Sequence, residues 1–97
     1  MPRYIALMKL TEKGIKDIKN APQRLEKAAT AIGAVGGKLV DFYTVMGEYD
    51  YVAVAEFPND EAGMIFLLTL GSQGNVRTTT LKAFDTQQFA ELVKKIP

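Results

Sequence analysis

One acidic residue interrupts the apolar stretch in the middle of the chain. Asp50 lies in the segment 49–57, Tyr-Asp-Tyr-Val-Ala-Val-Ala-Glu-Phe, although aspartate is disfavoured in β-strands. Its carboxylate could bind a ligand or carry a proton. It could equally accept hydrogen bonds near a hairpin or pair with Lys9 or Arg77, because a buried carboxylate needs such partners. Both interpretations stay open from the sequence.

Three further groups offer binding chemistry, and each has a structural alternative. Arg77 could clamp an anion, or its charge could keep an exposed edge strand from pairing with another chain. Tyr49 could stack on a ligand, although tyrosine at strand spacing is more often part of a core or an interface. The segment Ser72-Gln73-Gly74-Asn75 could present backbone N–H groups to an anion, or it could simply connect a helix to a strand.

The composition excludes several classes of chemistry. The 97 residues include no histidine and no cysteine. Ser-His and Cys-His nucleophile pairs, the usual zinc ligands, a histidine-ligated haem and a disulfide frame are therefore excluded. No spacing of Asp and Glu resembles a known calcium loop, so we expect no metal and no cofactor. The formal net charge of +1 gives no general attraction to nucleic acid or to anionic membrane.

Length and hydropathy indicate one small domain over residues 1–97. The longest strictly apolar run, Met64–Leu68, is far shorter than a membrane span. The N-terminal residues lack a signal-peptide pattern. We therefore predict a cytoplasmic protein with no membrane partner.

The hydrophobic pattern predicts four strands, two main helices and a C-terminal helix that would position these groups. Pro22 suits a first helical turn, and Gly36-Gly37 suits a helix end. Asp85 and Gln88 have the spacing of a capping box. The predicted strands are 3–10, 38–46, 49–57 and 76–84, with a tight hairpin turn at Gly47-Glu48; the predicted helices are 22–35, 60–71 and the segment after Asp85.

The order β-α-β-β-α-β is the ferredoxin-like, or split βαβ, pattern of the α+β class, here with a C-terminal helix added. It predicts an antiparallel sheet in strand order 4-1-3-2 with both main helices on one face. In this topology one end of the sheet gathers the end of the first strand, the hairpin and the start of the fourth strand. Convergent polar groups favour a small-molecule site, and those expected there are Lys9, Thr11, Asn20, Gly47, Glu48, Tyr49, Asp50, Gln73, Asn75 and Arg77.

Both faces of the predicted sheet are apolar. In the third strand Ala53 and Ala55 lie on one face, and Val52 and Val54 lie on the other. The helices can cover only one face, so we expect a second copy to cover the other, in a homodimer or a higher homo-oligomer. The alternative is a mildly apolar face that stays exposed.

Two segments resemble the GYD-domain family of small bacterial and archaeal proteins. Gly47-Glu48-Tyr49-Asp50 resembles the family's Gly-x-Tyr-Asp signature, and residues 70–78, Leu-Gly-Ser-Gln-Gly-Asn-Val-Arg-Thr, resemble its second segment. The first strand and the helix start at Ala21-Pro22 are also similar, although a Ser-type cap is more usual where this chain has Ala21. The resemblance implies a ferredoxin-like fold of the dimeric α/β-barrel kind and no known activity. It marks as candidate site positions Gly47, Tyr49, Asp50, Asn75 and Arg77.

These observations favour a small-molecule-binding or regulatory homo-oligomer with a polar site at the hairpin end. The alternative is a cofactor-independent monooxygenase-like or isomerase-like enzyme, with Asp50 as general base and Tyr49 or Arg77 stabilising negative charge. RNA binding agrees with the element order, but Glu48 and Asp50 would put negative charge on the binding platform, so a nucleic-acid partner is not expected. A structural module whose only chemistry is its interface also stays open.

Overall fold

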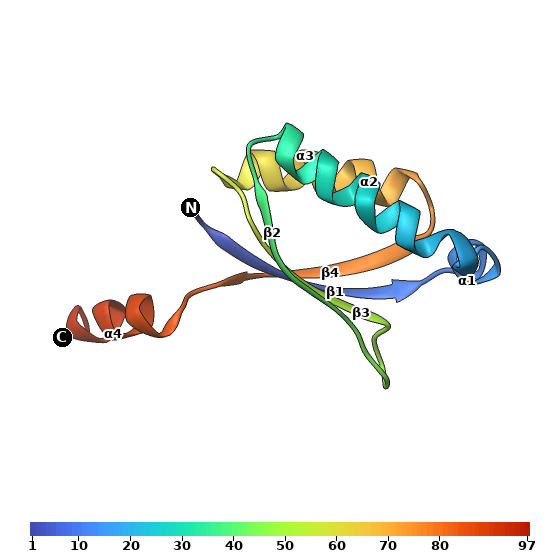
Figure 1. Cartoon of the computed structure of the whole chain (residues 1–97). Helices are drawn as coiled ribbons and strands as arrows, with labels where there is room; N and C mark the ends of the chain where they lie inside the picture. Colours follow the sequence, from blue (N-terminus) through green and yellow to red (C-terminus); the bar gives the residue numbers. More distant parts are fainter.

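A four-stranded antiparallel sheet carries two helices on one of its faces (Figure 1). The computed structural model describes residues 1–97. The strands are β1 (Arg3–Leu10), β2 (Lys38–Thr44), β3 (Tyr51–Glu56) and β4 (Val76–Ala83). The helices are α1 (Glu12–Lys16), α2 (Ala21–Ala34), α3 (Asp60–Ser72) and α4 (Thr86–Lys94), with a 3-10 turn at Ile18–Asn20. None of the helices is long and apolar enough to cross a bilayer.

The strand order is β2-β3-β1-β4, which confirms the predicted ferredoxin-like topology of the α+β class. The central strand β1 is antiparallel to both β3 and β4, so that Ala6 pairs with Ala53 on one side and with Thr80 on the other. Successive side chains of a strand point to opposite faces. These three residues therefore face the helices α2 and α3, and Ile5 and Leu7 lie on the other face.

Local signals set the helix ends. The helix α1 begins at the side-chain cap Thr11, and α3 begins at the side-chain cap Asn59. Asp85 and Gln88 make both hydrogen bonds of the predicted capping box at the start of α4. The helix α2 ends shortly before Gly36, which adopts the positive φ of 81° that glycine tolerates best.

The predicted tight turn at Gly47-Glu48 is wrong, because β2 ends earlier and β3 begins later along the chain than the sequence suggests. Residues 45–50 form the connection between β2 and β3. Asp50 is bonded to β1, where its backbone N–H donates to the carbonyl oxygen of Met8 at 2.9 Å. The last bond across the hairpin runs from the backbone N–H of Val45 to the carbonyl oxygen of Asp50 at 2.8 Å, so four residues, 46–49, form the loop. Gly47 lies within the connection with a φ of 116°.

The buried core is small and contains several alanines. The buried side chains are Ile32, Ala55, Phe57 and Ala62 in one cluster, and Met8, Ala53 and Val76 in the other. An alanine side chain fills little of the space between a sheet and a helix layer. The core therefore holds the two layers together without filling the whole gap between them.

The sheet face opposite α2 and α3 is apolar and uncovered. We call it the open face. Leu81 on it is 48% exposed. The prediction that the helices cover only one of two apolar faces is confirmed. Its apolar side chains are Ile5, Leu7, Val52, Val54 and Leu81, and the same face also carries Thr79 and the charged residues Arg3, Lys9, Glu56 and Arg77.

The helix α4 stands away from the rest of the molecule, beyond the end of β4 (Figure 1). The radius of gyration is 14.7 Å, against about 13 Å for a compact chain of 100 residues. A nine-residue helix is not stable in water by propensity alone. Its apolar stripe therefore needs a surface to pack on, and the exposed side chains of that stripe are Phe89, Leu92, Val93 and Ile96.

Candidate functional site

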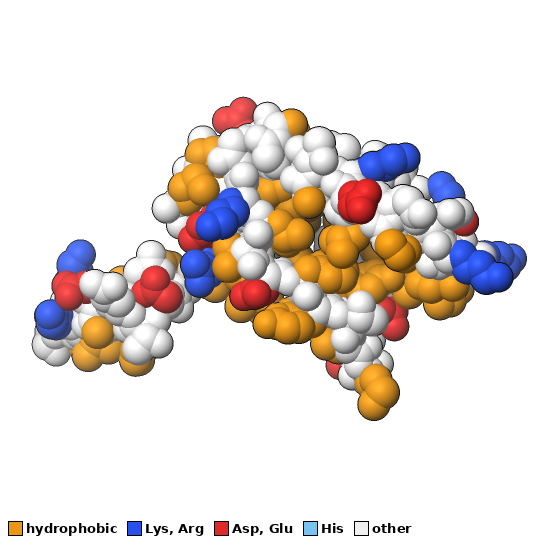
Figure 2. All heavy atoms as spheres, in the orientation of Figure 1, with side chains coloured by type: hydrophobic (Ala, Val, Ile, Leu, Met, Phe, Trp, Pro, Cys, Tyr) orange, Lys and Arg blue, Asp and Glu red, His pale blue; other side chains and the backbone are white.

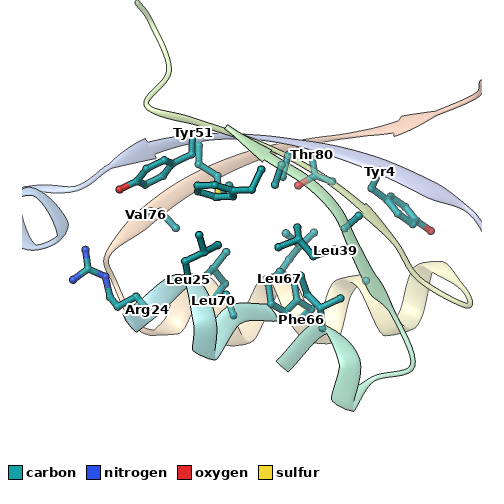
Figure 3. A pocket seen from close by; sticks show the side chains of 18 of the residues that line it. Tyr4, Arg24, Leu25, Leu39, Tyr51, Phe66, Leu67, Leu70, Val76 and Thr80 are labelled. Atoms are coloured by element: carbon teal, nitrogen blue, oxygen red, sulfur yellow. The ribbon is translucent and has the colours of Figure 1, made fainter. Parts of the chain in front are cut away.

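A cavity of about 580 Å³ lies between the sheet and the helices α2 and α3 (Figure 3). Small-molecule sites commonly have volumes of about 300–1,000 Å³. Leu25 of α2 and Leu67 and Leu70 of α3 project toward the sheet (Figure 3). The sheet contributes the small side chains of Ala6 and Ala53. Figure 2 shows hydrophobic atoms at the surface along the line where the two layers meet.

One end of the cavity lies at the hairpin end of the sheet and is polar. Tyr51, Gln73 and Asn75 border it, and so does Arg24 of α2. The Arg24 guanidinium donates to the carboxylate of Asp17 at 2.9 Å and to the backbone oxygen of the same residue at 2.8 Å. Beside this charge, the end presents neutral amides and a phenol.

A second polar group lies at the opposite end. The Tyr4 hydroxyl donates to the carboxylate of Asp60, and Lys82 forms an ion pair with that carboxylate at 3.1 Å. Burial raises the pKa of Tyr4 to about 12, and the hydrogen bond to Asp60 adds to the rise. The same hydrogen bond, followed by the one from Lys82, lowers the pKa of Asp60 below its ordinary value.

We expect Tyr4 to ionise only at about pH 12 in an alkaline titration. The raised pKa stabilises the fold at pH values below the ordinary tyrosine pKa of about 10. That contribution is lost as the pH rises through about 12. Asp60→Asn is expected to lower the pKa of Tyr4 only in part, since burial is the larger cause. Tyrosinate absorbance measures the titration, and a step at about pH 12 that survives in Tyr4→Phe would contradict the assignment.

Thr80 carries a buried hydroxyl without a hydrogen-bond partner. It lies in β4 and borders the cavity (Figure 3), and its Oγ1 atom is the only buried side-chain nitrogen or oxygen without a partner. A buried polar group left in this state costs about 1–3 kcal/mol. Thr80 therefore carries a neutral polar atom, enclosed beside the cavity, whose hydrogen bonding is incomplete.

The structure brings the sequence-predicted residues to one end of the sheet but divides them between its two faces. On the side of the open face, Lys9 pairs in register with Arg77. The ammonium of Lys9 lies 3.7 Å from a carboxylate oxygen of Glu48 and 5.3 Å from the ring centroid of Tyr49. These four residues form an exposed polar group outside the cavity.

The remaining predicted residues lie toward the cavity side. Gln73 and Asn75 border the cavity. The backbone N–H of Thr11 donates to the backbone oxygen of Asn75 at 3.0 Å, which ties β1 to the loop before β4. The Asn20 side-chain amide donates to Asp17 at 2.6 Å. Asn20 therefore supports the ion pair of Arg24 but does not border the cavity.

Asp50 completes the hydrogen bonding of β1 at its end. One carboxylate oxygen accepts the backbone N–H of Leu10 at 2.8 Å, while the backbone N–H of Asp50 donates to Met8 at 2.9 Å. Neither Asp50 nor Gly47 borders the cavity. The geometry gives Asp50 the accepting role near the hairpin that the sequence analysis held as its structural alternative.

Replacing Asp50 by alanine is expected to lower the free energy of unfolding by about 1–2 kcal/mol, because the N–H of Leu10 loses a charged acceptor. Glu48→Ala is the control: its carboxylate is exposed in a 3.7 Å pair with Lys9, and exposed pairs contribute about 0–1 kcal/mol. Urea unfolding measures both variants. Equal stability of Asp50→Ala and the parent would exclude this structural role.

The sequence analysis did not identify Leu25, Leu67 or Thr80 as part of a site. The signal that could have indicated a cavity is the row of small residues on one sheet face, Ala6, Ala53 and Ala55, opposite the leucines of two helices. Small residues on one layer do not by themselves predict a gap, since a helix can move closer. The distance between the layers is a property of the whole fold.

Comparisons with known proteins agree on a family and a fold. The sequence profile of the GYD domain matches residues 4–93. A Thermus thermophilus protein named glutamine synthetase and cystathionine beta-lyase binding protein is 31% identical over 97 residues, which cover 99% of each chain.

Three solved structures share the fold. The feast or famine regulatory protein of M. tuberculosis, complexed with L-methionine, matches with a TM-score of 0.67 at 21% identity, over 89% of this chain and 52% of its own. The leucine response regulatory protein of Mycobacterium tuberculosis matches with a TM-score of 0.57 at 18% identity, over 88% of this chain and 51% of its own. This chain thus spans about half the length of both regulators. A Thermus thermophilus protein matches with a TM-score of 0.52 at 25% identity, over 89% of this chain and 96% of its own.

Proposed function

Since the chain belongs to the GYD domain family, we propose that it is a regulatory binding protein, a cytoplasmic homo-oligomer that takes a small molecule into the cavity between its sheet and its helices. Similarity to a relative named as a binding protein supports the regulatory or binding role. The same similarity supports the proposal that the regulated protein is an enzyme and that this chain binds it directly. The small molecule would control that binding.

The cavity carries the proposal. It has a volume of about 580 Å³, hydrophobic side chains dominate its wall, and polar groups stand only at its ends and at Thr80. This distribution is that of a small-molecule site, in which apolar walls supply most of the affinity and a few polar groups orient the ligand.

The family positions support this site in different ways. Asn75 borders the cavity directly. Gly47, Tyr49 and Asp50 build the hairpin, and Asp50 anchors it to β1 immediately before Tyr51, whose ring borders the same end. We assign the hairpin residues the role of positioning the cavity mouth. Arg77 belongs to the exposed polar group on the other face and would contact a protein partner.

Two uncovered apolar surfaces support the homo-oligomer. The open face and the stripe of α4 expose hydrophobic side chains, among them Leu81 at 48% and Phe89 at 63%. Monomeric proteins rarely expose contiguous apolar surface of this kind. A second copy can cover both surfaces, since a two-fold axis lets each copy offer its α4 to the other.

Thermal unfolding in the presence of small metabolites tests the ligand part of the proposal. A ligand at about 100 times its dissociation constant adds about 2.7 kcal/mol and raises the midpoint of a domain of this size by several degrees. The shift is expected for the parent and not for a variant whose cavity is filled. If no apolar compound shifts the midpoint, or if the filled variant responds equally, the cavity is not a binding site.

A further inference from the structure

The two ends of the cavity differ in the charges that border it. At the end away from the hairpin, both members of the ion pair between Asp60 and Lys82 border the cavity. At the hairpin end Arg24 borders it, and its partner Asp17 does not. Figure 3 shows Arg24 on the helix layer at the same end as Tyr51 of the sheet. A ligand therefore meets at the hairpin end a cation whose counter-charge lies outside the cavity wall.

Arg24 has hydrogen-bond donors that the chain does not use. A guanidinium carries five N–H groups. Its Nη1 atom donates to two oxygens of Asp17, and its Nη2 atom donates once, to the backbone oxygen of Gly14 at 3.3 Å. The Nε–H and the second N–H of Nη2 are left without a partner in the chain. Nε and Nη2 are neighbouring atoms of the planar group, as the binding of a carboxylate through two hydrogen bonds requires.

The ion pair with Asp17 leaves Arg24 open to a second carboxylate. The Asp17 side chain is 52% exposed, and exposed ion pairs contribute little free energy. A second cation lies at the same end, because the ammonium of Lys13 donates to the backbone oxygen of Gln73 at 2.7 Å and forms no ion pair in the chain. The carboxylate of Asp50 is hydrogen-bonded to Leu10 and does not border the cavity.

The uncharged groups at the hairpin end also have hydrogen bonds to offer. The side-chain amides of Gln73 and Asn75 and the hydroxyl of Tyr51 border the cavity and make no hydrogen bond within the chain. Each can donate to an oxygen atom of a ligand. Beyond them the wall is apolar, with side chains such as Leu25 and Leu67. An apolar group gains free energy when it moves from water into such surroundings.

We infer that the ligand is a carboxylic acid with an apolar body, whose carboxylate binds Arg24 at the hairpin end while its body lies between the sheet and the helices. The inference rests on the proposed function, because it names the ligand class of the same cavity. It favours acids without an α-amino group, since an ammonium next to the carboxylate would lie beside the cations of Arg24 and Lys13.

Four naphthalene probes with a common body test the ligand class. They are the carboxylate 2-naphthylacetate, its uncharged carboxamide 2-naphthylacetamide, the ammonium 2-(2-naphthyl)ethylamine and the amino acid 3-(2-naphthyl)alanine. The chain contains no tryptophan, so naphthyl fluorescence is measured without indole background. The carboxylate is expected to bind about fivefold or more tightly than each of the other three, because its hydrogen bonds to the guanidinium are charge-assisted.

Two matched substitutions on α2 test the contact with Arg24. Arg24→Gln removes the cation, so the carboxylate is expected to bind within about twofold of the carboxamide, whose own affinity stays unchanged. The unchanged carboxamide shows that the cavity is intact. Lys27→Gln removes a positive charge from an exposed side chain that does not border the cavity, and it is expected to keep the preference of the parent for the carboxylate.

Arg24 also joins α2 to the segment before it through Asp17 and Gly14, so Arg24→Lys is a second, milder variant. It keeps the charge and loses two-point binding, and is expected to show a preference for the carboxylate between those of the parent and Arg24→Gln. Circular dichroism confirms that each variant is folded. The comparison of the four probes with the parent tests the ligand class without any substitution.

The outcomes separate this inference from the proposed function. If the carboxamide, the amine or the amino acid binds as tightly as the carboxylate, the ligand class is wrong but the cavity remains a binding site. If Arg24→Gln keeps the full preference for the carboxylate, the assigned contact is wrong. If none of the four probes binds, or if binding persists in a variant with a filled cavity, both the inference and the proposed cavity site are overturned.

Discussion

Leu67→Trp is expected to fold like the parent and to bind cavity ligands at least about tenfold more weakly. Leu67 is half-buried on α3 and projects into the middle of the cavity (Figure 3). An indole at this position takes the space that a ligand needs. Overpacking a filled core costs about 1–3 kcal/mol, but here the added atoms enter existing empty volume. The variant is therefore expected to be as stable as the parent or slightly more stable.

The adjacent residue provides a matched control. Leu68 is 65% exposed on the outer side of α3, so Leu68→Trp adds the same indole outside the cavity and is expected to bind like the parent. Because the chain has no other tryptophan, fluorescence emission reports each location, with a shorter emission wavelength for Leu67→Trp. Ligand binding by both variants is measured by fluorescence and by the ligand-induced shift of the thermal unfolding midpoint. Equal ligand binding by the two variants would place the ligand elsewhere.

Glutamates in the apolar stripe of α4 are expected to break up the homo-oligomer. Phe89 and Leu92 are 63% and 47% exposed within the single chain. If a second copy covers them, a Phe89→Glu, Leu92→Glu variant has to bury two unpaired carboxylates. Loss of two apolar anchors together with that burial weakens association by about 100-fold or more. The variant is expected to sediment as a monomer at concentrations where the parent is associated.

The opposite side of α4 provides the control for this experiment. Gln87 is exposed and lies about half a turn away from the stripe, so Gln87→Glu adds negative charge to the same helix without entering the interface. It is expected to associate like the parent. Sedimentation velocity over a range of concentrations measures all three proteins. If the double variant keeps the parent's association state, α4 is not part of the interface.

Much of the architecture was predictable because its signals are local. The capping box of Asp85 and Gln88 and the caps at Thr11 and Asn59 act over about three residues, and the structure shows all of them. The strand order followed from the element order, because right-handed, unknotted connections leave few alternatives. The hairpin was mispredicted for the opposite reason. Asp50 is held by Met8 and Leu10, which are distant in sequence.

The sequence by itself determined the elements, the sheet order, the two apolar faces and the end of the sheet at which the polar residues gather. Only the tertiary structure decided how those polar residues divide between two faces, where the cavity lies and that Thr80 has a buried hydroxyl without a partner. The physical reason is the distance along the chain over which each signal acts. Periodicity and caps depend on neighbours along the chain, whereas a cavity depends on how closely two layers pack. That distance is set by side chains such as Ala53 and Leu67, which meet only in the folded protein.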